Sequence, residues 1–170
     1  STASAVLAVF PHIGLVSGGT NVSVVGTNLV VGSTCRFGVV PAAASEWVSS
    51  YEVRCVAPAH DAGSYAVEVS SNVQDWTTSR VEFAFVSPAL VHGVSPPVGP
   101  EHGGTAVEVR AAVGLRTDTL MCRFGVGSAP VLAEWLSSQL LSCRSPPHGA
   151  GVNVSVAVSV NGQQFAATEG

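Results

Sequence analysis

The amino-acid sequence predicts an all-β protein made of two β-sandwich domains in tandem, over residues 1–87 and 88–170. Three observations support this prediction: the chain repeats itself, its apolar residues alternate with polar ones, and its composition suits a packed core. Hydrophobic residues make up 46% of the 170 residues and charged residues 11%, the reverse of the balance found in disordered chains.

The repeat consists of matching segments in the two halves of the chain. The sequence CRFG occurs once in each half. The segment FPHIGLVSGGTNVSVVG from Phe10 matches SPPVGPEHGGTAVEVRA from Ser95, an offset of 85 residues. The segment VSSNVQDW from Val69 matches VSVNGQQF from Val158, an offset of 89. Because loops between strands accept short insertions, this drift is compatible with two copies of one module.

Within each copy, valines alternate with other residues over short runs. Alternation of period two places the valines on a core and the residues between them, such as Ala66 and Glu68, toward water. Turn-forming residues separate the runs, and many short strands with turns at roughly 8–12-residue spacing indicate antiparallel β-sandwiches. The alternating valines are Val22, Val24, Val67 and Val69 in the first copy, and Val107, Val109, Val154, Val156 and Val158 in the second.

Each copy holds two cysteines, Cys35 with Cys55 and Cys122 with Cys143. Four cysteines allow three pairings, and the repeat favours a disulfide within each copy. Each bond would close a loop of about 20 residues, which stabilises a small domain by roughly 3 kcal/mol. A zinc site fits poorly because no C-x-x-C spacing occurs, and a catalytic cysteine fits poorly because both copies carry a pair.

Disulfides imply an oxidising compartment, and two sequons for N-glycosylation point the same way. They are Asn21-Val22-Ser23 and Asn153-Val154-Ser155. Both asparagines fall at outward positions of their predicted strands, so we expect Asn21 and Asn153 to be possible glycosylation sites.

The ordered motifs resemble the IPT/TIG domain, an immunoglobulin-like (E-set) β-sandwich. The first copy has P-x-x-G at Pro11, G-G-T at Gly18, V-x-V-x-G-x-N from Val22, and C-x-F-G at Cys35. It continues with V-x-C-x-x-P from Val53 and Ser71-Asn72. The second copy repeats most of this order from Pro96 to Asn161-Gly162, so the resemblance covers nearly the whole chain twice.

The second copy departs from the family pattern in two places. It has RAAVGL from Arg110 where the family has G-x-N, so we expect that turn to be built differently. The first copy also continues to RVEFAFV, from Arg80, which resembles a closing strand, and the second copy has no such segment. The second sandwich is therefore expected to lack its last strand within these residues.

Charge and motif content exclude several kinds of site. All 7 basic residues are arginines, they are scattered singly, and the net charge is −4, so we expect no nucleic-acid partner. No apolar run approaches the roughly 18 residues of a membrane helix, and no signal peptide is visible, so we expect no direct membrane insertion. No nucleophile elbow or phosphate-binding loop occurs, so we expect no enzyme, no cofactor and no metal.

Histidines and carboxylates are the remaining candidates for chemistry. His60 and His148 share one loop position, and the simplest interpretation is a duplicated surface turn residue. The residues His12, His92 and His102 are expected in exposed loops near the domain ends. Glu46-Trp47 and Glu134-Trp135 also repeat, but one carboxylate per module makes no acid–base pair.

The preferred hypothesis is a non-enzymatic extracellular module of a larger surface protein. The resemblance implies a stalk of IPT/TIG domains, as in plexins, that spaces, stiffens and contacts other ectodomains or neighbouring IPT/TIG domains. The junction VSPALVHGVSP has no Gly/Ser-rich spacer, which favours a semi-rigid segment. The absence of lysine suggests a GC-rich genome and, as a further hypothesis, an algal cilium or flagellar surface.

Two alternatives from other classes stay open. Some IPT/TIG domains belong to intracellular transcription factors, where they dimerise and contact DNA, although the net charge of −4 and the paired cysteines oppose this. Others are accessory domains of secreted carbohydrate-active enzymes.

Overall fold

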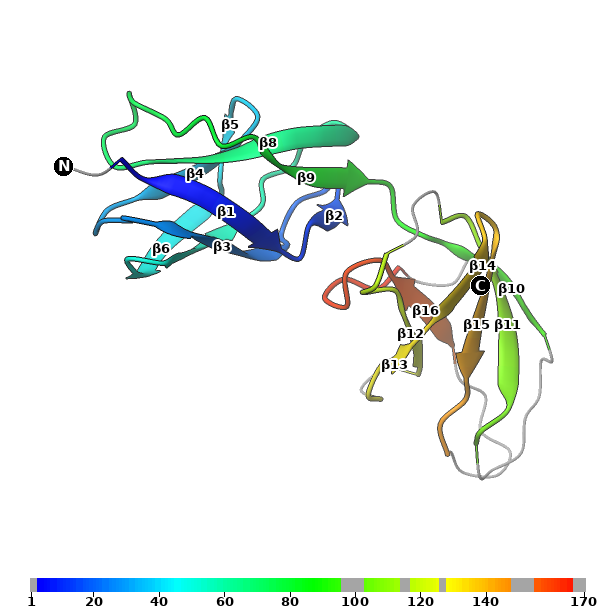
Figure 1. The fold of residues 1–170 in the computed structure, drawn as a ribbon. Helices are drawn as coiled ribbons and strands as arrows, with labels where there is room; N and C mark the ends of the chain where they lie inside the picture. The colour runs from blue at the N-terminus through cyan, green and yellow to red at the C-terminus, as the bar shows by residue number, and fades with distance from the viewer. Residues whose placement is uncertain (1–2, 96–102, 114–116, 126–127, 148–154, 167–170) are drawn as a thin grey trace. The chain divides into compact units, whose positions relative to one another are not determined.

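The computed structural model describes residues 3–95, 103–113, 117–125, 128–147 and 155–166, and every regular element in them is a strand (Figure 1). The chain divides into two compact units, Ser1–Ser87 and Pro88–Gly170. The all-β prediction is therefore confirmed. The two units are called domain 1 and domain 2 below.

Domain 1 is a sandwich of two sheets. The first sheet has the strand order β1-β3-β7-β6, and the second has the order β2-β9-β8-β4-β5. All pairings are antiparallel except that of β2 with β9. The strands are β1 (Ala5–Phe10), β2 (Ile13–Leu15), β3 (Asn21–Thr27), β4 (Thr34–Phe37), β5 (Val40–Pro41), β6 (Ala44–Ser49), β7 (Glu52–Val56), β8 (Gly63–Ser70) and β9 (Val81–Val86).

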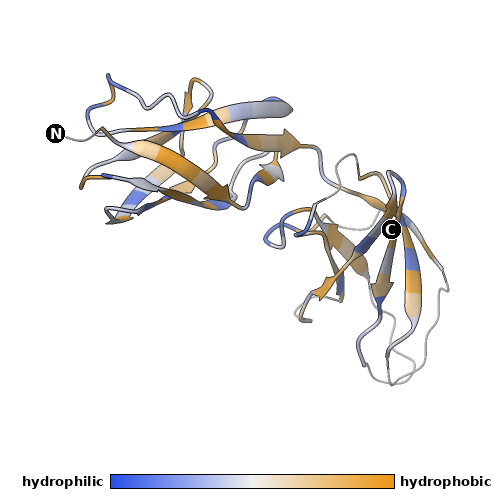
Figure 2. Cartoon of the chain, in the orientation of Figure 1, coloured by the Kyte–Doolittle hydropathy of each residue, from blue (hydrophilic) through white to orange (hydrophobic). Residues whose placement is uncertain are grey.

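Strand β3 shows how the sequence pattern produces this arrangement. Val22 and Val24 are buried, whereas Asn21 between the turn and Val22 is exposed. Val24 pairs with Val9 of β1 and with Val53 of β7, so one row of valines crosses the sheet on its inner face. Burial of each such side chain stabilises the fold by about 1.5–3 kcal/mol. Figure 2 shows the apolar residues along these strands.

Three phenylalanines from the opposite sheet complete the core of domain 1. Phe37 of β4 packs edge-to-face on Phe83 and Phe85 of β9, with ring centroids 5.2 and 5.8 Å apart. All three are at most 1% exposed. Edge-to-face pairs add about 0.5–1.5 kcal/mol beyond burial. The phenylalanine of the CRFG motif is thus a central core residue, on the same strand as Cys35.

Domain 2 repeats this plan. One sheet has the order β10-β11-β15-β14 and the other the order β13-β12-β16. Even local irregularities recur, since β1 and β10 each have a bulge, between Val6 and Ala8 and between Val91 and Gly93. The strands are β10 (Val91–Ser95), β11 (Ala106–Ala111), β12 (Met121–Phe124), β13 (Val131–Leu132), β14 (Glu134–Ser137), β15 (Leu140–Arg144) and β16 (Val156–Ser159).

The turn at RAAVGL differs from its counterpart in domain 1. In domain 1 the N–H groups of Gly26 and Leu29 donate to the carbonyls of Tyr51 and Ser50. In domain 2 the N–H groups of Ala111 and Val113 make the corresponding bonds to Gln139 and Ser138. One residue, Ala112, replaces the two residues Thr27 and Asn28 between the bonded positions, so the turn is one residue shorter. Asn28, with φ of 56°, has no counterpart in it.

The described part of domain 2 contains no counterpart of β9. The Ala166 N–H donates to the Val158 carbonyl at 3.1 Å, as the Thr77 N–H donates to Val69 at 3.1 Å in domain 1. This bond aligns Ala166 with Thr77. Since β9 begins at Val81, four residues after Thr77, its counterpart would begin at residue 170, and residues 167–170 lie outside the described part.

Candidate functional site

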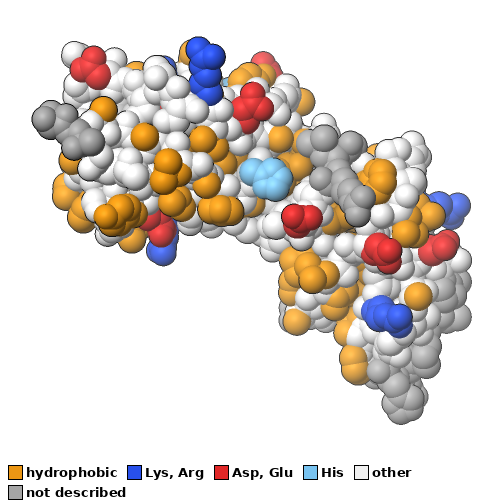
Figure 3. Space-filling view, viewed as in Figure 1, with side chains coloured by type: hydrophobic (Ala, Val, Ile, Leu, Met, Phe, Trp, Pro, Cys, Tyr) orange, Lys and Arg blue, Asp and Glu red, His pale blue; other side chains and the backbone are white. Residues whose placement is uncertain are grey.

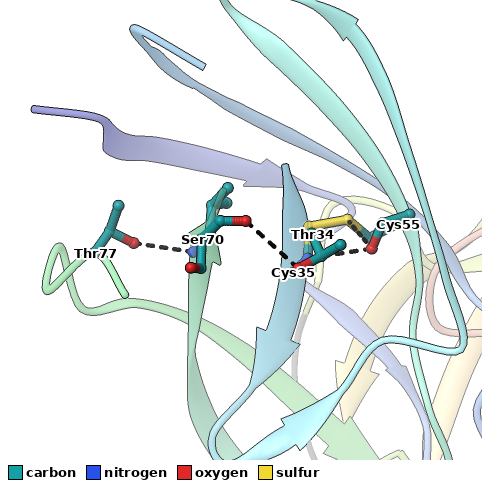
Figure 4. The surroundings of a disulfide bond; sticks show 7 residues. Thr34, Cys35, Cys55, Ser70 and Thr77 are labelled. Atoms are coloured by element: carbon teal, nitrogen blue, oxygen red, sulfur yellow. Dashed lines mark hydrogen bonds between the residues drawn. A yellow bond between two sulfur atoms is a disulfide. The ribbon is translucent and has the colours of Figure 1, made fainter. Parts of the chain in front are cut away.

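A disulfide joins the two sheets of domain 1 (Figure 4). Cys35 lies on β4 in one sheet and Cys55 on β7 in the other, and both are 1% exposed. The Ser45 hydroxyl of β6 accepts a hydrogen bond from the Cys35 N–H at 3.1 Å. The disulfide therefore ties the two sheets together within the buried core.

Domain 2 has the same cross-sheet bond. Cys122 on β12 is joined to Cys143 on β15, and these strands also belong to different sheets. The two cysteines are 0% and 2% exposed. Each disulfide closes within its own domain and leaves no free cysteine in the described part of the chain.

The arginine of each CRFG motif lies over an aromatic ring. The guanidinium carbon of Arg36 is 4.4 Å from the centroid of Trp76, and that of Arg123 is 4.5 Å from the centroid of Phe165. A cation over an aromatic face is attracted by about 0.5–1 kcal/mol at a partly exposed site. These pairs were not predicted from the sequence. The repeat nevertheless contains the signal, because Arg36 aligns with Arg123 and Trp76 aligns with Phe165.

A shared loop carries each aromatic ring to its arginine. In domain 1 the Ser70 hydroxyl donates to the Asn72 side-chain oxygen at 3.0 Å, and that oxygen accepts the N–H groups of Gln74 and Asp75 at 2.9 and 2.8 Å. Ser159 and Asn161 make the same bonds in domain 2, to each other at 3.1 Å and to the N–H groups of Gln163 and Gln164. The S-x-N element is therefore a hydrogen-bonded turn that directs the following aromatic residue.

This turn has positive φ at its next position in both domains. Val73 has φ of 63° and the aligned Gly162 has φ of 77°. Glycine adopts this conformation without steric conflict, whereas a β-branched residue is strained in it. Val73 is also 66% exposed, so domain 1 places a strained apolar side chain in water at this loop.

Glu68 corrects the alternation prediction, which placed it toward water. It is 5% exposed, because the loop that follows β8 folds over it. The Thr77 hydroxyl and the Ser79 N–H donate to Oε2, and the Arg80 N–H donates to Oε1 at 2.7 Å. In all three hydrogen bonds the carboxylate of Glu68 is the acceptor. Domain 2 has Ala157 and Ala166 at the positions of Glu68 and Thr77, so repeat comparison gave no signal for this carboxylate.

His60 is also less exposed than the sequence suggested. Its ring stacks on Phe85 with centroids 4.8 Å apart and lies 3.9 Å from the Tyr65 ring, and it is half-buried. Its role is to cover the end of the phenylalanine cluster. His12 and His92 are exposed, as expected, whereas His148 and His102 lie outside the described residues. Within the described ranges no group of three or more metal-ligating side chains comes together.

The two repeated tryptophans lie at the sheet edge rather than in the core. Trp47 is on edge strand β6, is 37% exposed, and donates from Nε1 to the Leu29 carbonyl at 3.2 Å. Its counterpart Trp135 is on edge strand β14. Both strands are bulged directly after the tryptophan, and the bulged residues, Val48 and Leu136, are 39% and 43% exposed. Glu46 and Glu134 beside them are exposed and separate from each other in sequence and domain.

Charges are dispersed over the surface. Figure 3 shows acidic and basic side chains scattered over the face that it draws, without a large patch of one sign. The Arg54 guanidinium pairs with Glu52 at 2.8 Å on the exposed face of β7. No helix in the described part of the chain is long and apolar enough to cross a membrane.

A family model supplies the decisive comparison. The IPT/TIG domain model matches this chain twice, over residues 4–85 and 89–170. The chain belongs to the IPT/TIG family. It is made of two IPT/TIG domains in tandem, and the predicted family and immunoglobulin-like fold class are confirmed.

Plexins are among the proteins that this IPT/TIG chain resembles. It is 33% identical to human Plexin-B1 over 171 residues, which covers 94% of the chain and 8% of Plexin-B1. The structure of the full extracellular region of Plexin A4, domains 1 to 10, superimposes with a TM-score of 0.67 at 18% identity, over 96% of this chain and 15% of that one. A second Plexin A4 extracellular structure, with domains 1 to 8, gives a TM-score of 0.62 at 18% identity and covers 98% of this chain and 18% of that one. The Plexin A4 structures support the fold, and the chain spans less than a tenth of the length of Plexin-B1.

Proposed function

We propose that this chain is a non-enzymatic extracellular module, a semi-rigid segment of a larger surface protein that spaces its neighbours and contacts other ectodomains. The observation that carries the proposal is the cross-sheet disulfide present in both domains. Such bonds persist in oxidising compartments and strengthen sandwiches that have small cores. Similarity to Plexin-B1, and to a protein solved as an extracellular region, supports the same location.

The spacer role is supported by the junction between the domains. Only the four residues Ser87, Pro88, Ala89 and Leu90 separate β9 from β10. Ala89 is 2% exposed and Leu90 is half-buried, and both belong to the compact unit of domain 2, so no long free segment separates the two units along the chain. Proline and short length both reduce the conformations available to a connection.

The exposed bulged residues of edge strands β6 and β14 are proposed as contact points for partner ectodomains. Val48 and Leu136 recur at the same position in both domains and flank a tryptophan. Partners of this kind would be neighbouring IPT/TIG domains or other ectodomains. A ciliary or flagellar surface is a narrower hypothesis that rests on composition alone.

The compartment is tested by a tryptic peptide map without reduction, on protein isolated from its native source. Cleavage at the arginines predicts two linked pairs, the peptide that ends at Arg36 with peptide 55–80, and peptide 117–123 with peptide 124–144. Detection of both pairs supports the extracellular module. Free thiols at all four cysteines in protein alkylated before lysis would overturn it, and the intracellular transcription-factor hypothesis would then be preferred.

The spacer role is tested separately by small-angle X-ray scattering. Insertion of a Gly/Ser segment between Ser87 and Pro88 should broaden the distribution of radii of gyration relative to the parent chain. A parent distribution that is already as broad as that of the insertion variant would contradict a semi-rigid junction.

A further inference from the structure

An exposed aromatic residue lies on the outer face of the first sheet of domain 1. Phe10, at the end of β1, is 60% exposed. It pairs with Ser23 of β3, directly after the buried pair of Val9 and Val24. Because consecutive pairs point to opposite faces, Phe10 and Ser23 share the outer face. A phenylalanine this exposed leaves most of its apolar ring in water.

The sequon of domain 1 lies on the same face. Val22, its middle residue, is 1% exposed and points into the core, so Asn21 and Ser23 point outward, and Asn21 is exposed. Asn21 is two residues from Ser23 and is therefore a diagonal neighbour of Phe10. Diagonal neighbours on one face of an antiparallel pair are about 7–8 Å apart, within reach of an aromatic side chain.

The second domain provides an internal comparison. Ser95 of β10 pairs with Glu108 of β11, in the register of Phe10 with Ser23. Domain 2 thus has serine in place of Phe10, and Ala106 in place of Asn21. The exposed ring and a sequon beside it occur together in domain 1, and domain 2 has neither at the aligned positions, although the backbone pairing is the same. The sequon of domain 2, at Asn153, is at a different position and lies outside the described residues.

We propose that Asn21 carries an N-linked glycan and that Phe10 is the platform on which its innermost N-acetylglucosamine packs. A pyranose has one face of axial C–H groups, and burial of this face against a ring removes apolar surface of both from water. The packed sugar shields Phe10 and holds the base of the glycan against the sheet. This inference rests on the extracellular location proposed above and adds a modification site and its supporting residue.

The first measurement is occupancy. The two-domain chain is secreted from a eukaryotic cell line, and its peptide 1–36 is analysed by mass spectrometry before and after treatment with an N-glycosidase, which converts a glycosylated asparagine to aspartate. We expect this conversion at Asn21. An unmodified Asn21 in secreted protein that contains both disulfides overturns the inference and leaves the extracellular module intact. Absence of the disulfides from native protein would instead overturn the proposed function.

The second measurement tests the role of Phe10. Amide hydrogen exchange of β1 and β3 is compared between glycosylated protein and Ser23→Ala, which removes the sequon and keeps Asn21. We expect exchange about two- to ten-fold slower with the glycan, the size of one aromatic contact. Phe10→Ser, which installs the residue of domain 2, should abolish this difference.

Leu7→Ser is the matched control, because Leu7 is on the same strand and is 61% exposed. The glycan-dependent difference should persist in this variant. If Phe10→Ser is not secreted, Phe10→Leu retains apolar bulk without the ring. Upfield ring-current shifts of the sugar protons in the glycosylated chain without substitutions report the contact directly. Equal glycan-dependent protection with and without the ring, or unshifted sugar protons, would refute the proposed packing.

Discussion

The carboxylate of Glu68 provides the sharpest test of how domain 1 is held together. It is 5% exposed and accepts hydrogen bonds from Thr77, Ser79 and Arg80. Hydrogen bonds to a charged acceptor contribute about 1.5–3 kcal/mol each when they are buried. We use the lower value, about 1.5 kcal/mol per bond, because the three donors lie in a surface loop. Water can reach these groups when the loop opens. Three bonds at about 1.5 kcal/mol each lead us to expect that Glu68→Ala reduces the free energy of unfolding of domain 1 by about 4.5 kcal/mol.

The assay is urea unfolding followed by tryptophan fluorescence in a Trp135→Phe background. The two remaining tryptophans, Trp47 and Trp76, both belong to domain 1, so the signal reports that domain alone. The midpoint should fall without a change in the slope of the transition. Glu82→Ala, which alters an exposed carboxylate on β9, is the control and should change stability by less than about 0.5 kcal/mol. A loss below about 1 kcal/mol in Glu68→Ala would refute the estimate that three charge-assisted bonds hold the loop.

Three further changes have expected outcomes in the same assay. Val73→Gly should stabilise domain 1 by about 1 kcal/mol, because it relieves the strain of positive φ; destabilisation would show that the exposed side chain has a packing role. Arg36→Met keeps the apolar stem over Trp76 and removes the cation, and should destabilise by about 0.5–1 kcal/mol; an unchanged midpoint would mean that the stem alone packs there. Joint replacement of Cys35 and Cys55 by alanine opens a loop with a sequence separation of 20 and should destabilise by about 3 kcal/mol, whereas a loss near zero would indicate that the reduced chain is already restrained.

The burial of a side chain could be predicted from the sequence where it depends only on the neighbouring residues in the strand. Alternation at Val22 and Val24 correctly placed these side chains in the core, since strand geometry alone dictates which face they take. The family and the fold class followed from ordered motifs. The alternation depends only on neighbouring residues, and the ordered motifs occur in both copies of the repeat.

The burial of a side chain could not be predicted from the sequence where a loop folds over the outer face of a strand. Glu68 alternates correctly with its neighbours yet is buried, because residues from the following loop cover the outer face of β8. The contact of Arg36 with Trp76 likewise depends on a turn that brings together residues 40 positions apart. Alternation describes the two faces of an isolated sheet and has no information on which face a loop will cover.

The bulges in edge strands β6 and β14 have a consequence for folding fidelity. A chain that contains nearly the same strands twice risks exchanging them between neighbouring copies as it emerges and folds. An edge strand interrupted at Val48 or at Leu136 presents no continuous row of backbone donors and acceptors to an unpaired strand. The same bulge in both copies therefore disfavours pairing of strand β6 or β14 with an unpaired strand of the other copy.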